Sequence, residues 1–217
     1  MLKTLMLSRE SGIRSRPTVL STVEDPLVNG PSPPTISELD NLFKVCGVQL
    51  AVHASRKAIN EWGGSAQDIT HLVSVSCTNS ANPGYDLDVA KELGLNLDID
   101  RVLLHGVGCA GGLSTLRTAA NMLCAAAHRG KPARALVLAT ELNTPLLRNS
   151  LDCIEQESRV NVAVALFSDC ASALVLSNGI EPAQFECPVY HVENWQQQLI
   201  PNTQSDLQVN VSTTGMF

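Results

Sequence analysis

Hydrophobic positions along the chain repeat with two periods, one typical of helices and one typical of buried strands. After residues 17–34, whose five prolines predict an extended surface connection, a helical spacing begins. Its positions are Leu39, Phe43, Cys46, Leu50, Ala54 and Lys57. A capping box from Thr35 to Glu38 precedes these positions, and the pair Gly63-Gly64 follows them. The pattern therefore predicts one long helix from residue 35 to the glycine pair.

Apolar, β-branched runs alternate with further helical patterns in the rest of the chain. Strands are predicted over 69–78, 101–106, 134–140 and 171–177, and helices over 86–93, 111–129 and 160–166. Residues 135–139 are continuously apolar, as parallel strands covered on both faces require. From Phe185 onward the pattern predicts short strands. The order of elements predicts the α/β class with a layered parallel sheet.

Composition excludes several classes of function. The 217 residues are 44% hydrophobic and 17% charged, enough for one sizeable domain or two small ones. A net charge of -6 argues against a nucleic acid or an anionic membrane surface as partner. No run approaches the roughly 18 apolar residues of a membrane span. The seven cysteines, without a C-x-x-C pair, predict reduced thiols and a cytoplasmic location.

The stretch RVLLHGVGCAGGL, residues 101–113, allows two interpretations. Gly106, Gly108 and Gly111 spell G-x-G-x-x-G after a strand and before a helix, which is the dinucleotide-binding pattern. That pattern expects an acidic residue roughly 20 positions on. The candidate, Glu141, follows Gly106 by 35 positions, and a thiol at residue 109 has no role against a pyrophosphate. This interpretation is therefore the weaker one.

The stronger interpretation makes Cys109 a nucleophile on a sharp strand-to-helix turn. The flanking glycines would clear space around it, and the helix dipole would lower the thiol pKa from its usual value near 8.5. Nearby backbone N–H groups could hold an oxyanion. The alternative for Cys109 is a small buried hydrophobic residue, which we expect for the other six cysteines.

Four motifs together resemble the type III polyketide synthases of the chalcone and stilbene synthase family, especially the fungal members. They are residues 70–80 (THLVSVSCTNS), 105–112 (HGVGCAGG), 135–141 (ALVLATE) and 165–171 (ALFSDCA). The resemblance implies a thiolase-like fold of two similar α/β halves, usually a homodimer. It implies that this chain is mainly the first, nucleophile-bearing half, incomplete at both ends. Residues 1–34 would be an N-terminal remnant and Pro-rich connection, and residues 35–217 the N-terminal-type domain.

The activity implied by the resemblance is acyl transfer in polyketide biosynthesis. Cys109 would take an acyl group from a coenzyme A thioester and extend it with malonyl-CoA by decarboxylative Claisen condensation, without a further cofactor or metal. Phe167 matches a gatekeeper position, and Asn79 and Ser80 match positions that line the acyl cavity. Further positions match cavity-shaping residues less closely: Asn143, Ala163, Ser168, Leu207 and Val209.

Other readings remain open from the sequence. The family's catalytic His and Asn come from its second half, and none of the five histidines here matches them. His105 is interpreted as a core or dimer-side residue. The chain is therefore expected to be a truncated form that folds poorly alone. The alternatives are a condensing enzyme of the β-ketoacyl synthase III type, or a non-catalytic fragment that dimerises with a full-length relative.

Overall fold

The computed structural model describes residues 2–21, 24–157, 161–181, 187–203, 205–206, 211–212 and 215–216. The chain divides into two compact units, each with its own elements. The sheet unit comprises residues 43–141 and 171–195. The helical unit comprises residues 1–42, 142–170 and 196–217.

A four-stranded sheet forms the centre of the sheet unit. In spatial order β2-β1-β3-β4, its strands are β2 (Asp100–Leu104), β1 (His71–Val75), β3 (Arg134–Glu141) and β4 (Cys170–Ser177). β1 runs parallel to both β2 and β3, and Val73 is in register with Val102 and Val137. The N–H of Asn178 donates to the carbonyl of Ala133 (3.2 Å), so the end of β4 meets the start of β3. β4 is therefore antiparallel, where the sequence predicted a parallel sheet throughout.

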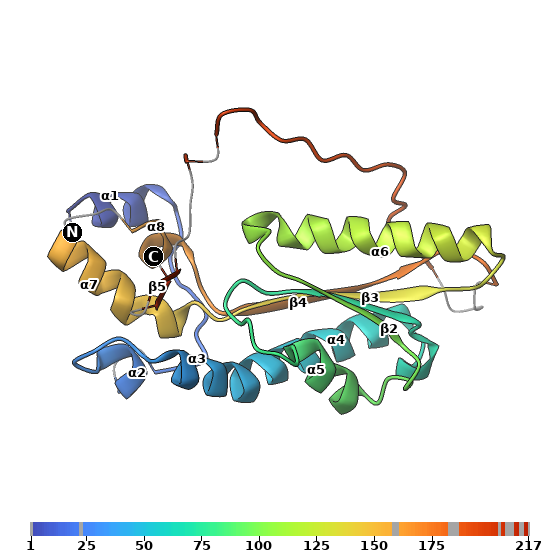
Figure 1. The fold of residues 1–217 in the computed structure, drawn as a ribbon, viewed down its shortest axis with the longest axis horizontal. Helices are drawn as coiled ribbons and strands as arrows, with labels where there is room; N and C mark the ends of the chain where they lie inside the picture. Colours follow the sequence, from blue (N-terminus) through green and yellow to red (C-terminus); the bar gives the residue numbers. More distant parts are fainter. Residues whose placement is uncertain are drawn as a thin grey trace. The chain divides into compact units, whose positions relative to one another are not determined.

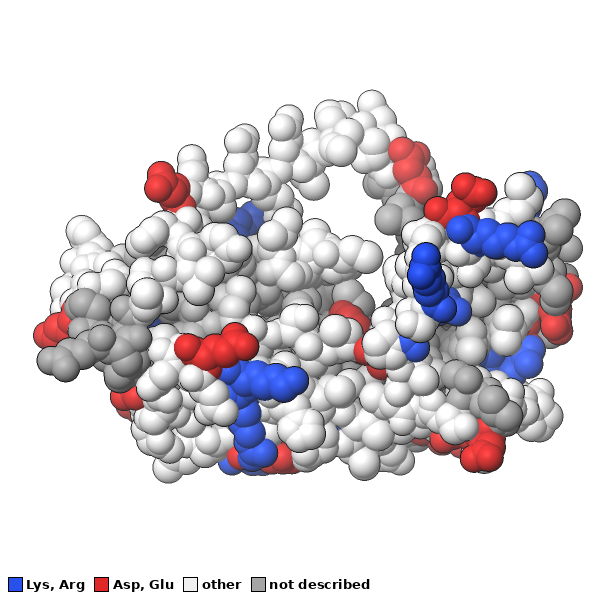
Figure 2. All heavy atoms as spheres, turned by 180° about the vertical axis from the view of Figure 1, so that it is seen from behind, with Lys and Arg blue, Asp and Glu red and all other residues white. Residues whose placement is uncertain are grey.

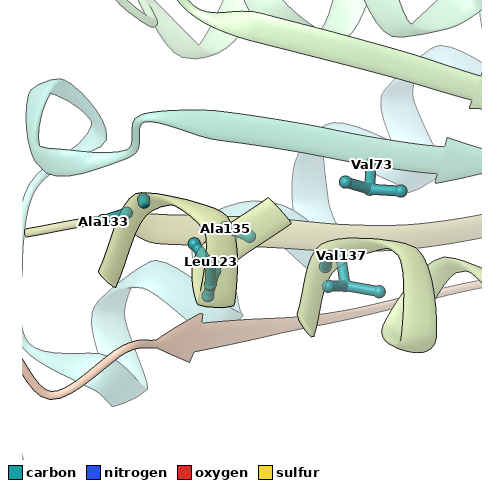
Figure 3. Close-up of a cluster of buried hydrophobic side chains, with 7 residues drawn as sticks. Val73, Leu123, Ala133, Ala135 and Val137 are labelled. Atoms are coloured by element: carbon teal, nitrogen blue, oxygen red, sulfur yellow. The ribbon is translucent and has the colours of Figure 1, made fainter. Parts of the chain in front are cut away.

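Helices cover both faces of this sheet (Figure 1). α6 (Gly111–His128) lies on one face, and α4 (Val48–Trp62) and α5 (Tyr85–Leu93) lie on the other. Beneath α6 is a cluster of buried apolar residues (Figure 3): Val73, Ala119, Leu123, Ala126, Ala133, Ala135 and Val137. Burying a side chain the size of valine or leucine contributes about 1.5–3 kcal/mol. The predicted α/β class, with strands covered on both faces, is confirmed.

The helical segment predicted after residue 35 is confirmed, but it contains one irregularity. It consists of α3 (Ile36–Leu42), a π-helical segment (Phe43–Gly47) and α4. The Thr35 N–H donates to the Glu38 carboxylate (2.7 Å) and the Glu38 N–H donates to the Thr35 hydroxyl (3.3 Å), which confirms the capping box. Gly63, with φ of 89°, ends α4.

The π-helical segment changes which face of α4 is buried. A π turn holds one residue more than an α turn, so it rotates every later side chain around the helix axis. Of the positions that predicted the helix by their spacing, Leu50 is half-buried and Lys57 is exposed. The buried residues of α4 are instead Val48, Ala51, Val52, Ser55, Ala58 and Ile59. The predicted stripe is correct at Phe43 and wrong beyond it.

The helical unit contains two longer helices that the sequence analysis did not predict. They are α1 (Leu2–Glu10) and α7 (Leu147–Glu157). α8 (Val162–Leu166), which was predicted, packs against both of them. The described part of residues 17–34 lacks regular structure except for the short α2 (Pro26–Asn29), which packs against α7.

The C-terminal region differs from its prediction. Residues 187–203 contain neither helix nor strand. Beyond them, the described residues form one short antiparallel pair, β5 (Val211–Ser212) with β6 (Gly215–Met216). The short strands predicted after Phe185 are therefore wrong for residues 187–203.

On the face drawn in Figure 2, acidic and basic side chains lie interspersed. Among the described residues, no helix is long and apolar enough to cross a membrane.

Candidate functional site

Glycines shape the turn between β2 and α6. Gly106 and Gly108 have φ of 71° and 56°, in the left-handed region that side chains with a Cβ disfavour. Gly111 has a different role, because a Cβ there would lie 2.7 Å from Cγ2 of Val75. The first two glycines therefore allow the sharp turn, and the third lets α6 approach β1. The predicted strand-to-helix elbow is confirmed.

Cys109 lies at the top of this elbow and is exposed. It occupies a 3₁₀ turn, Gly108–Ala110, directly before the first residue of α6. The alternative that Cys109 is a small buried hydrophobic residue is therefore wrong. Its thiol can be reached from solvent and stands at the positive end of a long helix, which favours negative charge.

The acidic candidate of the dinucleotide interpretation has another role. Glu141, at the end of β3, accepts the N–H of Cys77 on Oε1 (2.8 Å). Its Oε2 accepts the N–H and the hydroxyl of Thr78, at 3.0 and 2.7 Å. The carboxylate thus holds the chain where it leaves β1 and is already bonded on both oxygens. This arrangement counts further against a ribose-binding role.

Cys77 lies beside the elbow. It is half-buried, and burial together with the neighbouring Glu141 carboxylate raises the pKa of its thiol to about 11. Cys109 adds to this rise, whereas the backbone of Gly108 lowers the pKa of the Cys77 thiol. Sequence reasoning did not single out Cys77, because its neighbours come from other elements.

The prediction that the remaining cysteines are buried is wrong for most of them. Cys124, Cys170 and Cys187 are exposed, and Cys46 is half-buried like Cys77. The side chain of Cys153 lies outside the described part of the structure. The helical period places Cys124 within the apolar pattern of α6, but on the side of the helix that faces away from the sheet.

A pocket of about 360 Å³ opens beside the loop that follows β1. Its lining includes Ser80 but neither Asn79 nor Cys109: it consists of residues 80–84 with Asp86, Arg101, Leu103 and His105. Asn79 is buried, and its side-chain oxygen accepts the N–H of Ala81 (3.2 Å). The two residues that were predicted together therefore lie in different surroundings.

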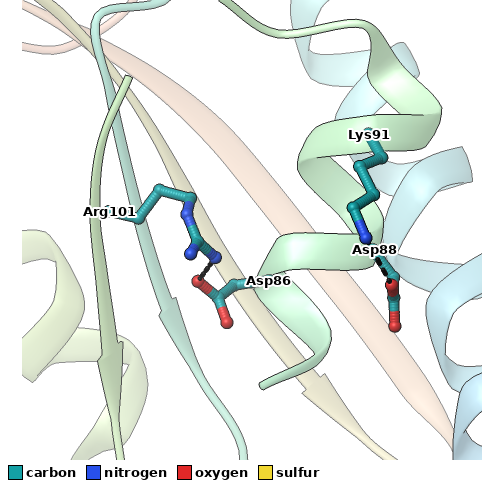
Figure 4. A network of polar contacts seen from close by, with 4 residues as sticks. All are labelled: Asp86, Asp88, Lys91 and Arg101. Carbon is teal, nitrogen blue, oxygen red and sulfur yellow. Dashed lines mark hydrogen bonds and ion pairs between the residues drawn. The ribbon is translucent and has the colours of Figure 1, made fainter. Parts of the chain in front are cut away.

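Two polar contacts fix the walls of this pocket. The Arg101 guanidinium, on β2, reaches the Asp86 carboxylate at the start of α5 (2.5 Å; Figure 4). Burial raises the pKa of Asp86, and the charge of Arg101 opposes that rise. His105 is exposed, with Nδ1 lying 3.1 Å from the carbonyl of Ser76. The core alternative for His105 is therefore wrong, and the dimer-side alternative stays a prediction.

The other predicted substrate residues belong to the helical unit. Phe167 directly follows α8 and is 41% exposed. The Asn143 side-chain amide donates to the carbonyl of Ser168 (2.8 Å), which brings those two predicted residues together. Ala163 lies in the first turn of α8, where its N–H donates to Asn161 (2.9 Å). Leu207 and Val209 lie outside the described residues.

Asp169 organises this part of the helical unit, and the sequence analysis did not assign it a role. It is 4% exposed. Its Oδ1 accepts the N–H groups of Asn143 (2.7 Å) and Thr144 (2.8 Å), and its Oδ2 accepts the N–H of Val19 (2.9 Å). One carboxylate thus fixes the chain around Asn143 and next to Phe167.

Comparison with known proteins extends these observations. The family model "Chalcone and stilbene synthases, N-terminal domain" matches residues 2–181. An acylalkylpyrone synthase of Aspergillus oryzae is 42% identical over 98% of this chain and 54% of its own length. A type III polyketide synthase of Penicillium soppii is 44% identical over 93% of this chain and 51% of its own length. The chain thus spans about half the length of the curated relatives it matches.

Solved structures agree with this result. A type III pentaketide synthase from Neurospora crassa has a TM-score of 0.95 and 48% identity, and covers 100% of this chain and 57% of that one. The fold is therefore the thiolase-like α/β fold that the sequence motifs implied. With a match over most of its length and a cysteine exposed on the glycine elbow, the chain belongs to the chalcone and stilbene synthase family.

Proposed function

We propose that this chain carries the nucleophile of a type III polyketide synthase. The Cys109 thiolate attacks the carbonyl carbon of an acyl-CoA, and the thiolate of coenzyme A leaves, so that the acyl group is bound to the cysteine. Malonyl-CoA then loses carbon dioxide, and its enolate attacks the acyl carbonyl. This second attack releases the Cys109 sulfur and lengthens the chain by two carbons.

The observation that carries this proposal is the position of Cys109. The thiol is exposed on a turn that ends at the N-terminus of α6. A helix N-terminus favours a thiolate and offers backbone N–H groups to an oxyanion. The named activities of the relatives support the chemistry, as does the solved structure of a relative "complexed with CoA-SH", which is 42% identical to this chain.

The proposed substrates are acyl-CoA and malonyl-CoA, with no additional cofactor. The residues proposed to line the acyl cavity are Asn79, Ser80, Asn143, Ala163, Phe167 and Ser168. We also propose that the N-terminal-type domain begins at residue 35, after the Pro-rich connection that ends at residue 34. The histidine and asparagine that the family uses to stabilise negative charge match no residue of this chain, so its own contribution is acyl capture.

We also propose that the protein forms a homodimer. Among the described residues no strand pairs with the outer edge of β2, so its outward backbone groups can pair with a second copy. Sedimentation velocity tests this proposal, which a protein that stays monomeric at micromolar concentration would contradict.

Incubation with a radiolabelled acyl-CoA tests the proposed chemistry. The protein should retain label through denaturation, and peptide mapping should locate it on Cys109. The variant Cys109→Ala should retain none. Cys124→Ala, which removes another exposed cysteine from α6, is the matched control and should label like the unchanged protein. Label that persists in Cys109→Ala would contradict the proposal.

The same assay separates the two enzymatic alternatives. A type III polyketide synthase accepts the malonyl unit from free coenzyme A, whereas a condensing enzyme of fatty-acid type requires a carrier-protein thioester. In protein preloaded with the labelled acyl group, release of label with malonyl-CoA would support the polyketide synthase, and release only with a malonyl carrier-protein thioester would support the condensing enzyme.

A further inference from the structure

Two cysteines from different segments of the chain lie near the elbow, Cys109 on the turn itself and Cys77 beyond the end of β1. β1 and β2 are paired in parallel, with Val75 in register with Leu104. The pairing direction continues one residue further, where the carbonyl of Ser76 lies 3.1 Å from Nδ1 of His105. Cys77 is the second residue after β1, directly behind Ser76, so it leaves the sheet beside the turn that carries Cys109.

Contacts from both sides hold this arrangement. On the β3 side, Glu141 accepts the N–H of Cys77 at 2.8 Å and so fixes its backbone. On the elbow side, the backbone of Gly108, the residue before Cys109, lies near enough to the Cys77 thiol to lower its pKa. α6 packs closely against β1, since the Val75 side chain leaves no room for a Cβ at Gly111. The Cys77 thiol therefore lies near both the Glu141 carboxylate and the elbow.

The two thiols differ in access. Cys109 is exposed and Cys77 is half-buried, so an oxidant in solution meets Cys109 first. The elbow also has space in which to adjust: no atom lies within 4 Å of the place where a Cβ on Gly106 or Gly108 would stand. Formation of a disulfide would require the turn to bring the two sulfurs to bonding distance.

We propose that Cys77 is a resolving cysteine, which forms a reversible disulfide with Cys109 when hydrogen peroxide oxidises the elbow. This disulfide would close the nucleophile to acyl groups and protect it from irreversible oxidation. The loss of acyl capture rests on the proposed function, whereas the formation of the disulfide does not.

The chemistry balances in two steps. The Cys109 thiolate attacks one oxygen of hydrogen peroxide, the O–O bond breaks, and Cys109 becomes a sulfenic acid while hydroxide leaves and is protonated to water. The Cys77 thiolate then attacks the Cys109 sulfur, the S–S bond forms, and the S–O bond breaks to release a second water. Two thiols are oxidised by two electrons, and one peroxide is reduced to two waters.

The raised pKa of Cys77 sets the pH dependence of the second step. At neutral pH only a small fraction of this thiol is thiolate, because burial and Glu141 raise its pKa to about 11. Closure from the sulfenic acid should accelerate about tenfold for each pH unit between pH 7 and 9, as the thiolate fraction does. A thioredoxin-type or small dithiol reductant should open the disulfide again.

Peroxide treatment of the reduced protein tests the inference. After treatment, free thiols are alkylated and the digest is analysed by mass spectrometry. The expected result is a pair of peptides linked through Cys77 and Cys109, which dithiothreitol separates. Conversion of Cys109 to sulfinic acid without the linked pair, or two thiols that both stay reduced, would overturn the proposal.

Two variants sharpen the test. In Cys77→Ala, the linked pair cannot form, and Cys109 should proceed to the sulfinic acid at least tenfold faster. Cys124→Ala, the control, should give the linked pair in the same yield as the unchanged protein. If the linked pair forms but reduced Cys109 takes no acyl group from acyl-CoA, the proposed function fails while the disulfide stands.

Discussion

Asp169 holds several segments together, but its role could not be predicted from the sequence. It lies within the quoted motif at residues 165–171, yet its role depends on N–H groups far away along the chain. The N–H of Asn143 is 26 residues distant and that of Val19 is 150 residues distant. Cys109, in contrast, could be predicted because the glycines that shape its turn are its sequence neighbours.

Replacing Asp169 by alanine should strongly destabilise the protein. Three N–H groups would lose their acceptor in a site where the side chain is almost fully buried. An unsatisfied buried donor costs about 1–3 kcal/mol, so the total loss should be on the order of 3 kcal/mol or more. Urea denaturation measures it as a lower midpoint.

The matched control is Asp98→Ala, which removes an exposed carboxylate from the turn before β2. Surface substitutions of this kind usually change stability by less than about 0.5 kcal/mol. Asp169→Asn, which retains one acceptor oxygen, should fall between the two. Equal midpoints for Asp169→Ala and Asp98→Ala would show that the three hydrogen bonds contribute little.

At the scale of whole elements, sequence periodicity identified the strands of the sheet and the helices that cover it. It failed where an element departs from its regular period. Gly47 lies in the π-helical segment, and a Cβ there would stand 2.8 Å from the ring of Phe43. Gly47 was therefore the residue in the sequence that could have indicated the π-helical segment. α7 also had a signal, since Leu147, Leu151 and Ile154 repeat at helical spacing.

The two glycines that begin α6 should respond oppositely to alanine. In Gly111→Ala, the new Cβ would lie 2.7 Å from the Val75 side chain, which is itself buried. Overpacking of this kind typically costs about 1–3 kcal/mol. In Gly112→Ala, no atom lies within 4 Å of the new Cβ, and alanine favours the helix by up to about 1 kcal/mol.

Thermal unfolding of the two variants measures this difference. Gly111→Ala should melt below the unchanged protein and Gly112→Ala at or above it. Because Gly111 also sets the distance between α6 and β1, the first variant should capture acyl groups on Cys109 more slowly. Two variants that melt at the same temperature would refute the close packing inferred for Gly111.

For the molecule as a whole, the division into units was the hardest property to predict. The helical unit gathers three segments that are widely separated in the sequence, whereas the predicted boundary cuts the chain once, after residue 34. Local patterns identify elements but not which distant segments pack together. The shifted pKa values of buried and half-buried groups could not be predicted either, because the residues around each group come from several elements.

Those buried groups predict that stability decreases at alkaline pH. The pKa of Cys77 is raised from 9.0 to about 11, so between these values the unfolded chain loses a proton that the folded protein keeps. The contribution is fully present below pH 9 and is lost as the pH rises toward 11. Because the thiol is only half-buried, the slope should stay below about 1.4 kcal/mol per pH unit.

Urea midpoints measured in reducing buffer from pH 8 to pH 11 test this prediction, with Cys77→Ser as the variant that removes the titrating thiol. The unchanged protein should lose stability faster than Cys77→Ser above pH 9. Burial also raises the pKa of Tyr85, whose hydroxyl donates to the carbonyl of Val75 (2.9 Å), so the variant should still lose stability near the upper end. Parallel curves over the whole range would mean that Cys77 has the same pKa in the folded and the unfolded chain. That result would contradict the inference that burial and Glu141 raise the pKa of this thiol.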